Sequence, residues 1–118
     1  MSVNKVILLG NVGNDPEIRY PEKDKPLALV SLATNDHTPK GIETTEWHKL
    51  VFFGELASMV EKYVRKGTQL YIEGKLKTRE YEDRMKINRR VTEIHVHFFE
   101  ILGRRQQNQN QNPEVNPG

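Results

Sequence analysis

Cysteine is absent from this chain of 118 residues, and so are long apolar runs. Without cysteine the protein has no disulfide, no thiolate metal site and no thiol nucleophile. No apolar run approaches the roughly 18 residues that a membrane-spanning helix needs, so no membrane partner is expected. The segment MSVNKVILLG has one lysine and a very short apolar run, which is typical of a first strand and not of a signal peptide. We therefore expect a cytoplasmic protein.

Patterns that would indicate catalysis are also scarce. His95 and His97 can share a strand face, but no third ligand stands at a spacing that would complete a metal site. His37 and His48 have no evident Ser or Asp partner in the sequence, and the glycine-rich segment GNVGND at 10–15 lacks the spacing of a phosphate-binding loop. The sequence predicts a protein that is not an enzyme and has no metal or cofactor.

The small net charge of +2 conceals an uneven distribution. Residues 75–90 carry seven basic and three acidic side chains, a net charge of +4. Residues 1–74 carry nine basic and ten acidic side chains, and residues 91–118 carry two and three, so each of these parts has a net charge of −1. A basic window of this kind can be a solvated hairpin, and the alternative is a site for a polyanion.

Hydrophobic periodicity predicts five strands and one helix. The strands are expected at 3–9, 27–34, 46–53, 68–79 and 90–102, and the helix at 55–67. A short extended piece is expected around Ile18 and Tyr20, a polar loop at 35–45, a bulge or bend at Gly74 and a charged hairpin tip at 80–89. The apolar stripe of the helix consists of Leu56, Met59, Val60, Tyr63 and Val64.

An all-β fold follows from this order of elements. Five strands with a helix between the third and the fourth are the arrangement of the OB-fold, a five-stranded Greek-key barrel. An SH3-like barrel or a small α+β sheet is the competing architecture, but these rarely place a three-turn helix at that point. We expect one domain at 1–103, followed by a disordered tail at 104–118 that is rich in Gln and Asn.

Two of the predicted strands carry aromatic and basic residues on the face opposite the core. In the strand 46–53, Leu50 and Phe52 are expected to point inward, and the opposite face holds Trp47, Lys49, Val51 and Phe53. In the strand 68–79, which can continue into the hairpin, the expected core residues are Leu70, Ile72, Leu76 and Thr78. The opposite face of that strand holds Tyr71, Glu73, Lys75, Lys77, Arg79 and Tyr81.

Rings and cations on one surface suit a single strand of nucleic acid. Its bases stack on aromatic side chains with about 1–3 kcal/mol per base, whatever the base. Lys and Arg along the same surface neutralise its phosphates. The alternative is that Trp47 and Phe53 cap a second side of a sandwich or fill a subunit interface, although an interface core usually excludes lysine.

Over residues 2–103 the chain resembles the bacterial single-stranded DNA-binding proteins. The matching segments are VNKVILLGNVGNDPEIRY, SLAT, TEWHKLVFFGELA, EKYVRKGTQLYIEGKLKTREY and ILGRR, in this order. The resemblance implies an OB-fold without enzymatic activity that binds single-stranded DNA without sequence preference and protects it in replication, recombination and repair, associated with the nucleoid. It also implies a homotetramer, with a dimer as the alternative, and Val96 and Phe98 are expected to add exposed apolar surface for assembly.

The resemblance also assigns roles to single residues. It implies that Trp47, Phe53 and Tyr81 stack on bases, and that His48 lies at a subunit interface. The basic residues that it places along the DNA are Arg19, Lys49, Lys66, Lys77 and Arg79. We add Lys75 and Arg84 of the basic window to this path, and Val3 and Lys5 to the subunit interface.

Some positions depart from the family pattern. The loop NDHTPKG lacks a tryptophan that many members carry, with His37 as a candidate partial replacement, and Glu55 and Glu80 stand where lysine is usual. These changes predict weaker and more salt-sensitive binding. The tail ends in NPEVNPG, without the acidic tip by which the family recruits replication and repair proteins, so the resemblance alone does not predict such partners.

Two further hypotheses remain at this point. The chain can be an OB-fold assembly factor that resembles the primosomal replication protein and acts mainly through protein contacts in the replisome, which the missing tip and the reduced aromatics favour. Negligible affinity for single strands at physiological salt, together with a protein partner, would select it. A nucleic-acid enzyme is the remote alternative, and turnover of labelled DNA would reveal it.

Overall fold

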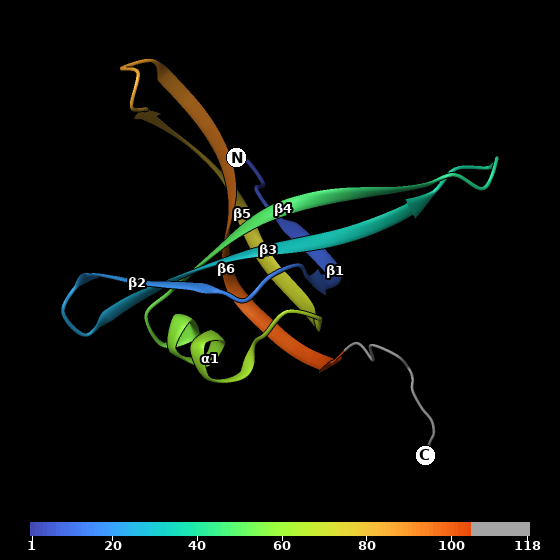
Figure 1. The fold of residues 1–118 in the computed structure, drawn as a ribbon, viewed down its shortest axis with the longest axis horizontal. Helices are drawn as coiled ribbons and strands as arrows, with labels where there is room; N and C mark the ends of the chain where they lie inside the picture. Colours follow the sequence, from blue (N-terminus) through green and yellow to red (C-terminus); the bar gives the residue numbers. More distant parts are fainter. Residues whose placement is uncertain (105–118) are drawn as a thin grey trace.

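The structure is a computed structural model, and it describes residues 1–104 (Figure 1). The elements are β1 (Val6–Val12), β2 (Glu17–Glu22), β3 (Lys25–His37), β4 (Glu43–Phe53), α1 (Glu55–Tyr63), β5 (Thr68–Glu82) and β6 (Asn88–Arg104). Of the tail predicted at 104–118, only Arg104 is described, and it still belongs to β6; the rest lies outside the described residues. Within the described part of the chain, no helix is long and apolar enough to cross a membrane.

Five of the strands close into a barrel. The strand order is β1-β5-β6-β4-β3-β2, and β1 also pairs with β3 at Asn11 and Val12, which closes the ring. β4 and β6 pair in parallel, whereas the other pairs are antiparallel. The predicted OB-fold barrel with one helix is therefore confirmed. β2 is an additional strand on the outer edge of β3, where the sequence indicated only a short extended piece.

Two hairpins extend beyond the barrel as two-stranded ribbons (Figure 1). β3 and β4 remain paired as far as His37 and Glu43, so the polar loop predicted at 35–45 is wrong except for a turn at 38–42. β5 and β6 remain paired as far as Glu82 and Asn88, so the predicted tip at 80–89 shrinks to a turn at 83–87. We call residues 35–45 the β3–β4 arm and residues 77–92 the β5–β6 arm.

The helix α1 is shorter than the predicted 55–67. It begins after Gly54, whose φ of 62° suits glycine, and ends at Tyr63. Val64 takes an extended conformation and is fully buried, so the chain turns into the core one turn earlier than expected. Gly67, the last residue of the predicted helix, lies outside α1 and donates its N–H to the carbonyl of Val12 at 2.8 Å.

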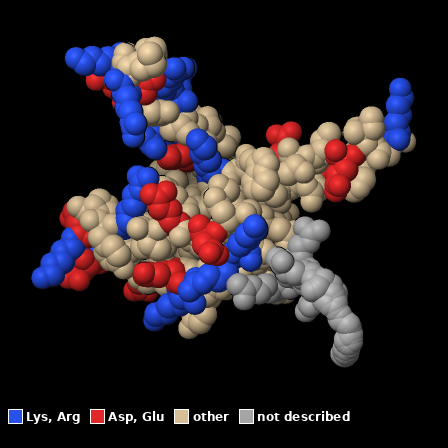
Figure 2. All heavy atoms as spheres, in the orientation of Figure 1, with Lys and Arg blue, Asp and Glu red and all other residues tan. Residues whose placement is uncertain are grey.

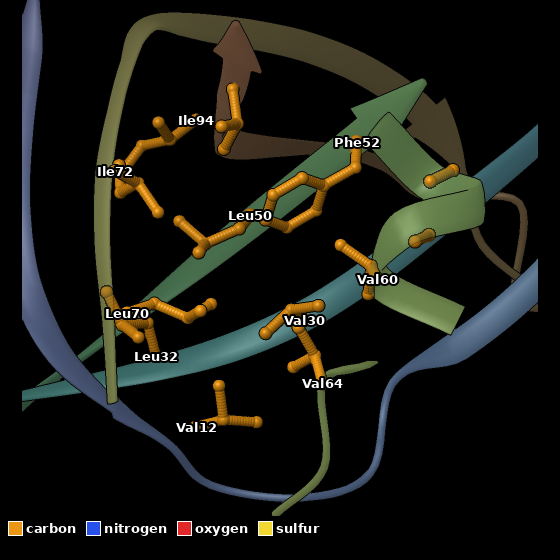
Figure 3. Packing of buried hydrophobic residues seen from close by; sticks show 13 residues of the cluster. Val12, Val30, Leu32, Leu50, Phe52, Val60, Val64, Leu70, Ile72 and Ile94 are labelled. Carbon is orange, nitrogen blue, oxygen red and sulfur yellow. The ribbon is translucent and has the colours of Figure 1, made fainter. Parts of the chain in front are cut away.

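The core lies between the barrel strands and α1 (Figure 3). Its largest fully buried side chains are Phe52, Leu32, Leu50, Leu70, Ile72, Val60 and Val64. The inward orientation predicted for Leu50, Phe52, Leu70 and Ile72 is thus confirmed. It is wrong for Leu76 and Thr78, which are exposed because β5 leaves the barrel after Gly74 and enters the arm. Met59 and Tyr63 of the predicted helix stripe are also exposed, and α1 buries Ala57 and Val60.

A bulge lies opposite Gly74, in β6 and not in β5 as predicted. Glu73 pairs with Phe98 and Gly74 with Val96, which leaves His97 as the extra residue. A Cβ on Gly74 would lie 2.4 Å from the carbonyl oxygen of His95, so only glycine permits this approach. The extra residue shifts the alternation, so Val96 and Phe98 lie on opposite faces of β6. Val96, expected to be exposed, is buried, whereas Phe98 is exposed as expected.

Candidate nucleic-acid interface

The outer face of β4 forms the centre of a groove across the barrel. Lys49 pairs with Ser31 of β3, and Val51 pairs with Leu29 of β3 and with His95 of β6, so the same face continues over three strands. The residues that line this binding groove include Asp15, Glu17, Arg19, Leu29, Ser31, Lys49, Val51, Arg79, Tyr81, Val91 and Glu93. Val51 has the predicted orientation but is buried, and it forms part of the apolar floor.

The three aromatic residues predicted to stack on bases are all exposed. The exposed fractions are 61% for Trp47, 47% for Phe53 and 44% for Tyr81. The ring of Phe53 meets the ring of His95 edge to face, with 5.0 Å between the centroids. The guanidinium of Arg79 lies 5.6 Å from the centre of the Tyr81 ring. The rings of Phe53 and Tyr81 are therefore each supported by a neighbouring side chain and still leave surface for a ligand.

Most of the predicted cations lie on the same face. Arg19, Lys49 and Arg79 line the binding groove, and Lys75 and Lys77 continue the face of β5 because they pair with His95 and Glu93. The two other predicted cations lie outside the groove lining. Lys66 follows α1, where its backbone N–H donates to Asp15, and Arg84 is at the tip of the β5–β6 arm. Figure 2 shows basic side chains gathered on this arm, at the upper left.

The cations differ in how much they are already neutralised. Arg19 is paired with Glu17 at 2.7 Å, and Arg79 with Glu93 at 3.0 Å. The remaining predicted cations have no ion pair within the described chain: Lys49, Lys66, Lys75, Lys77 and Arg84. These free charges are the ones that can meet phosphates without first giving up a carboxylate.

A buried carboxylate in the groove escaped the sequence analysis. Glu93 is only 6% exposed, its Oε2 accepts a hydrogen bond from Nε of Arg79 at 3.1 Å, and the same oxygen forms an ion pair with Nη2 of Arg79 at 3.0 Å. Its Oε1 lies 3.4 Å from Nε2 of His95. Burial raises the pKa of the Glu93 carboxyl, but the hydrogen bonds and charges of Arg79 and His95 outweigh it, so the pKa lies below its ordinary value. The alternation of side chains in β6 predicts that Glu93 and His95 share a face. It does not predict that this face is the one that holds the groove.

The residues predicted at a subunit interface lie around the exposed Leu76. The side chain of Asn4, between Val3 and Lys5, exchanges two hydrogen bonds with the backbone of Leu76, at 3.0 and 2.9 Å. Leu76 also lines a surface hollow together with His48, and Trp47 and Lys49 line the same hollow. The His48 ring is half-buried, with Nε2 2.9 Å from the hydroxyl of Thr34.

A second exposed surface lies on the outside of β1, β5 and β6. Ile7 pairs with Glu73, and Leu9 with Tyr71, so their side chains share one face. The ring of Tyr71 meets the ring of Phe98 at 6.2 Å, and Leu102 lines the same surface. We call Ile7, Leu9, Tyr71, Phe98 and Leu102 the apolar outer face. All except Tyr71 are exposed by about two fifths or more.

Metal ligands do not cluster in the described residues. Over 1–104, no group of three His, Asp or Glu residues lies close enough together to hold a metal ion. His95 and His97, which the sequence placed on one face, are separated in environment: His95 turns toward Glu93, whereas His97 is the exposed bulge residue. The groove therefore offers rings, cations and a neutralised carboxylate as its chemical groups.

An OB-fold barrel with an aromatic and basic groove is typical of proteins that bind nucleic acids or oligosaccharides. Comparisons with known proteins show which family within this class the chain matches. The model of the single-strand binding protein family matches residues 3–102. Single-stranded DNA-binding protein 1 of Xylella fastidiosa (strain 9a5c) is 43% identical over 112 residues, which cover 91% of this chain and 82% of that protein. The single-stranded DNA-binding protein of Bacteroides thetaiotaomicron is 47% identical over 108 residues, which cover 86% and 67%.

A solved structure of a protein from the same class is also similar to this chain. The Plasmodium falciparum SSB in its complex with ssDNA superposes with a TM-score of 0.78 at 30% identity, over 86% of this chain and 96% of that one. The chain belongs to the single-strand binding protein family. The predicted resemblance is therefore confirmed, and with it the expectation of a non-enzymatic DNA-binding protein.

Proposed function

We propose that this chain binds single-stranded DNA without sequence preference, by stacking bases on Trp47, Phe53 and Tyr81 while nearby cations neutralise phosphates. The observation that carries this proposal is the shared face: the exposed Trp47 and Phe53 lie on either side of Lys49 along the outer face of β4, and Lys49, Arg79 and Tyr81 line the groove beside them. Relatives that bear the name of single-stranded DNA-binding proteins, and a related structure solved with ssDNA, support it. The cellular role is protection of single strands in replication, recombination and repair, in the cytoplasm at the nucleoid.

The arrangement suits an unpaired strand. Trp47 and Phe53 are six residues apart on β4, a separation of about 20 Å for an extended strand, so they contact different nucleotides. Between them the groove has an apolar floor at Val51 and a free cation at Lys49. Rings stack on any base, and cations contact phosphates that every nucleotide carries, which explains the absence of sequence preference. We assign this binding to residues 1–103, where all of these residues lie.

Trp47 is the only tryptophan in the chain, so its fluorescence tests the proposal directly. Oligo-dT of graded length should quench it in a saturable manner, and the slope of log K against log salt should be about −0.7 per phosphate contacted. By fluorescence anisotropy of a labelled oligonucleotide, Trp47→Ala should lose about 1–3 kcal/mol. Ile42→Ala, an exposed apolar change on the β3–β4 arm, is the matched control and should bind like the parent protein.

Absence of saturable quenching at low salt would contradict the proposal. In that case the alternative, an assembly factor of the replisome that acts through protein contacts, would gain support. That alternative needs a defined protein partner whose binding is unaffected by Trp47→Ala.

Self-assembly is the second part of the proposal. Only Asn11 and Val12 of β1 pair with β3, so within residues 1–104 the other end of β1 has one edge without a strand partner. The apolar outer face is a separate uncovered surface. Two different self-complementary surfaces on one chain generate a closed tetramer, so we propose a homotetramer with Val3, Lys5 and His48 near its interfaces.

Light scattering distinguishes the possible assemblies. We expect four times the chain mass for the full-length protein, and a smaller species for Phe98→Glu, which places a charge on the apolar outer face. A dimer would mean that only one of the two surfaces is used. A monomeric parent protein would contradict this part of the proposal without affecting the binding groove.

A further inference from the structure

Gly13 lies directly beneath the indole of Trp47. A Cβ built on Gly13 would lie 2.3 Å from Cζ3 and 2.7 Å from Cη2 of Trp47, and 3.5 Å from Cε3. Carbon atoms that are not bonded do not approach each other to less than 3 Å, so no side chain can occupy this place while the ring remains there. The six-membered ring of the indole therefore rests against the backbone of residue 13.

The backbone itself does not require glycine at this position. Gly13 is not among the residues with a positive φ, and just after the end of β1 its N–H donates to the carbonyl of Ser31 in β3 at 2.9 Å. The three nearest atoms to the added Cβ all belong to Trp47. Gly10 differs in this respect, because its Cβ would lie 2.2 Å from the backbone oxygen of Ala33, where β1 closes onto β3. Gly10 therefore allows two strands of the barrel to approach each other, whereas Gly13 allows the Trp47 ring to approach the backbone.

Three adjacent strands bring Trp47 to this position. Trp47 of β4 pairs with Ala33 of β3, and Ala33 pairs with Asn11 of β1. The indole reaches from β4 to the chain just after β1, where the following residues Asn14 and Asp15 line the binding groove. The ring thus lies at the edge of the groove and is still 61% exposed.

We infer that Gly13 is a positioning residue for DNA binding: it is the seat that fixes the Trp47 indole in the orientation in which a base can stack on it. This inference rests on the proposed function, because it concerns the same groove. A ring held against the backbone loses less freedom when a base stacks on it than a ring that rotates in solvent. A methyl group on residue 13 would remove the seat, and the ring would rotate away about its two side-chain bonds while the barrel stays folded.

A double-mutant cycle tests the inference with four full-length proteins: the parent, Gly13→Ala, Trp47→Phe and the double variant. Phenylalanine lacks the outer part of the indole, so the added methyl group no longer collides with the ring. Stacking on one ring corresponds to about a fivefold to hundredfold change in affinity. We therefore expect Gly13→Ala to weaken oligo-dT binding about fivefold in the parent, and less than twofold in the Trp47→Phe background.

Fluorescence gives a readout that does not depend on DNA. Without DNA, Gly13→Ala should shift the Trp47 emission to longer wavelength and increase its quenching by acrylamide, with little change in the thermal unfolding midpoint. Gly41→Ala is the matched glycine control. Its Cβ meets no atom within 4 Å, but its φ is +83°, so it should lower stability and leave the Trp47 emission unchanged.

The outcomes separate this inference from the proposed function. If the parent protein does not bind oligo-dT, the proposed function fails, and the emission shift alone still decides whether Gly13 holds the ring. If the parent binds and Gly13→Ala binds equally well with unchanged emission, the inference is overturned. An equal loss of affinity in the parent and in the Trp47→Phe background would also overturn it, because Gly13 would then act through the fold and not through Trp47.

Discussion

The β3–β4 arm and the β5–β6 arm end in the same five-residue turn, built from different residues. At 38–42, the N–H of Thr38 donates to the carbonyl of Ile42 at 2.9 Å, and the N–H of Gly41 donates to the carbonyl of Thr38 at 2.9 Å. The hydroxyl of Thr38 accepts a further bond from the N–H of Ile42 at 3.1 Å, and Gly41 has a φ of 83°. The turn thus needs an oxygen-bearing side chain first and a left-handed residue fourth.

Residues 83–87 repeat each of these features. Asp83 donates to Ile87 at 3.1 Å and accepts from Lys86 at 2.9 Å, and its carboxylate accepts from the N–H of Ile87 at 3.0 Å. Lys86 takes the left-handed position with a φ of 61°. The Asp83 carboxylate also accepts from Nε of Arg89 at 2.8 Å, and this hydrogen bond, followed by those from the backbone, holds its pKa below its ordinary value.

The surfaces of the two arms are nevertheless opposite in character. The β5–β6 arm has six basic and three acidic residues, a net charge of +3, whereas the β3–β4 arm has one basic and two acidic residues, a net charge of −1. Figure 2 shows this contrast between the basic arm at the upper left and the mostly uncharged arm at the right. One backbone design thus carries two surfaces, and only one of them suits a polyanion. We infer that DNA leaves the groove along the β5–β6 arm.

The largest expected effect comes from neutralising the basic arm. The triple variant Lys77→Ala, Arg84→Ala, Lys86→Ala removes three cations that have no ion pair in residues 1–104. If each contacts one phosphate, the salt slope should become less steep by about 2, and affinity at low salt should fall about 10- to 100-fold. Fluorescence anisotropy over a salt series measures both quantities.

The other arm supplies the control for this experiment. Lys40→Ala removes the only cation of the β3–β4 arm and should change affinity by less than twofold. A loss for Lys40→Ala as large as one third of that of the triple variant, on a logarithmic scale, would show that DNA contacts both arms equally.

A smaller effect is expected for the carboxylate at the base of the basic arm. Glu93→Gln should lower the free energy of unfolding by about 1–2 kcal/mol at pH 7, less than for a fully buried pair because Arg79 is half-exposed. The pKa of Glu93 is lowered in the folded protein, so its stabilisation is present above the ordinary carboxyl pKa and is lost as the pH falls below it. The difference between the variant and the parent should therefore shrink from pH 7 to about pH 3 in urea unfolding.

The β3–β4 arm again provides the comparison. Glu43 lies 3.9 Å from His37, and both side chains are exposed. Glu43→Gln should change stability by less than about 0.5 kcal/mol at any pH. If Glu93→Gln has an equally small and pH-independent effect, the Glu93 pair does not contribute to stability.

The sequence predicts those features of the fold that depend on a local pattern of residues. The barrel strands and Leu50 and Phe52 were predictable, because period-two alternation over a buried strand is a strong signal. The arms were not, because residues 35–45 are polar on both faces and only pairing with the other strand shows that they are extended. Glu93 and the seat at Gly13 depend on contacts between strands distant in sequence, and no local pattern encodes those contacts.

A tryptophan on the β3–β4 arm should make the two arms more alike. His37 is exposed at the end of β3, on the arm where the resemblance predicts a stacking residue that this chain lacks. His37→Trp should raise the affinity for oligo-dT about fivefold, which corresponds to about 1 kcal/mol for one additional stacked base. The salt slope should stay the same, because no phosphate contact is added. An unchanged affinity would indicate that DNA does not reach this arm even when a ring is offered.

The smallest effect concerns the turn itself, and it separates backbone strain from charge. A left-handed conformation costs a residue with a side chain about 1 kcal/mol, and glycine avoids this cost but gains freedom in the unfolded chain. Lys86→Gly should therefore raise the free energy of unfolding by about 0.5 kcal/mol. It should also lower the affinity for DNA, because one cation that can contact a phosphate is lost. The reciprocal change Gly41→Lys should lower stability by a similar amount. Urea unfolding of both variants measures these differences. If the two turns are equivalent, the changes in the free energy of unfolding must have opposite signs. A loss of stability for Lys86→Gly would mean that contacts of the Lys86 side chain outweigh the strain of its left-handed conformation.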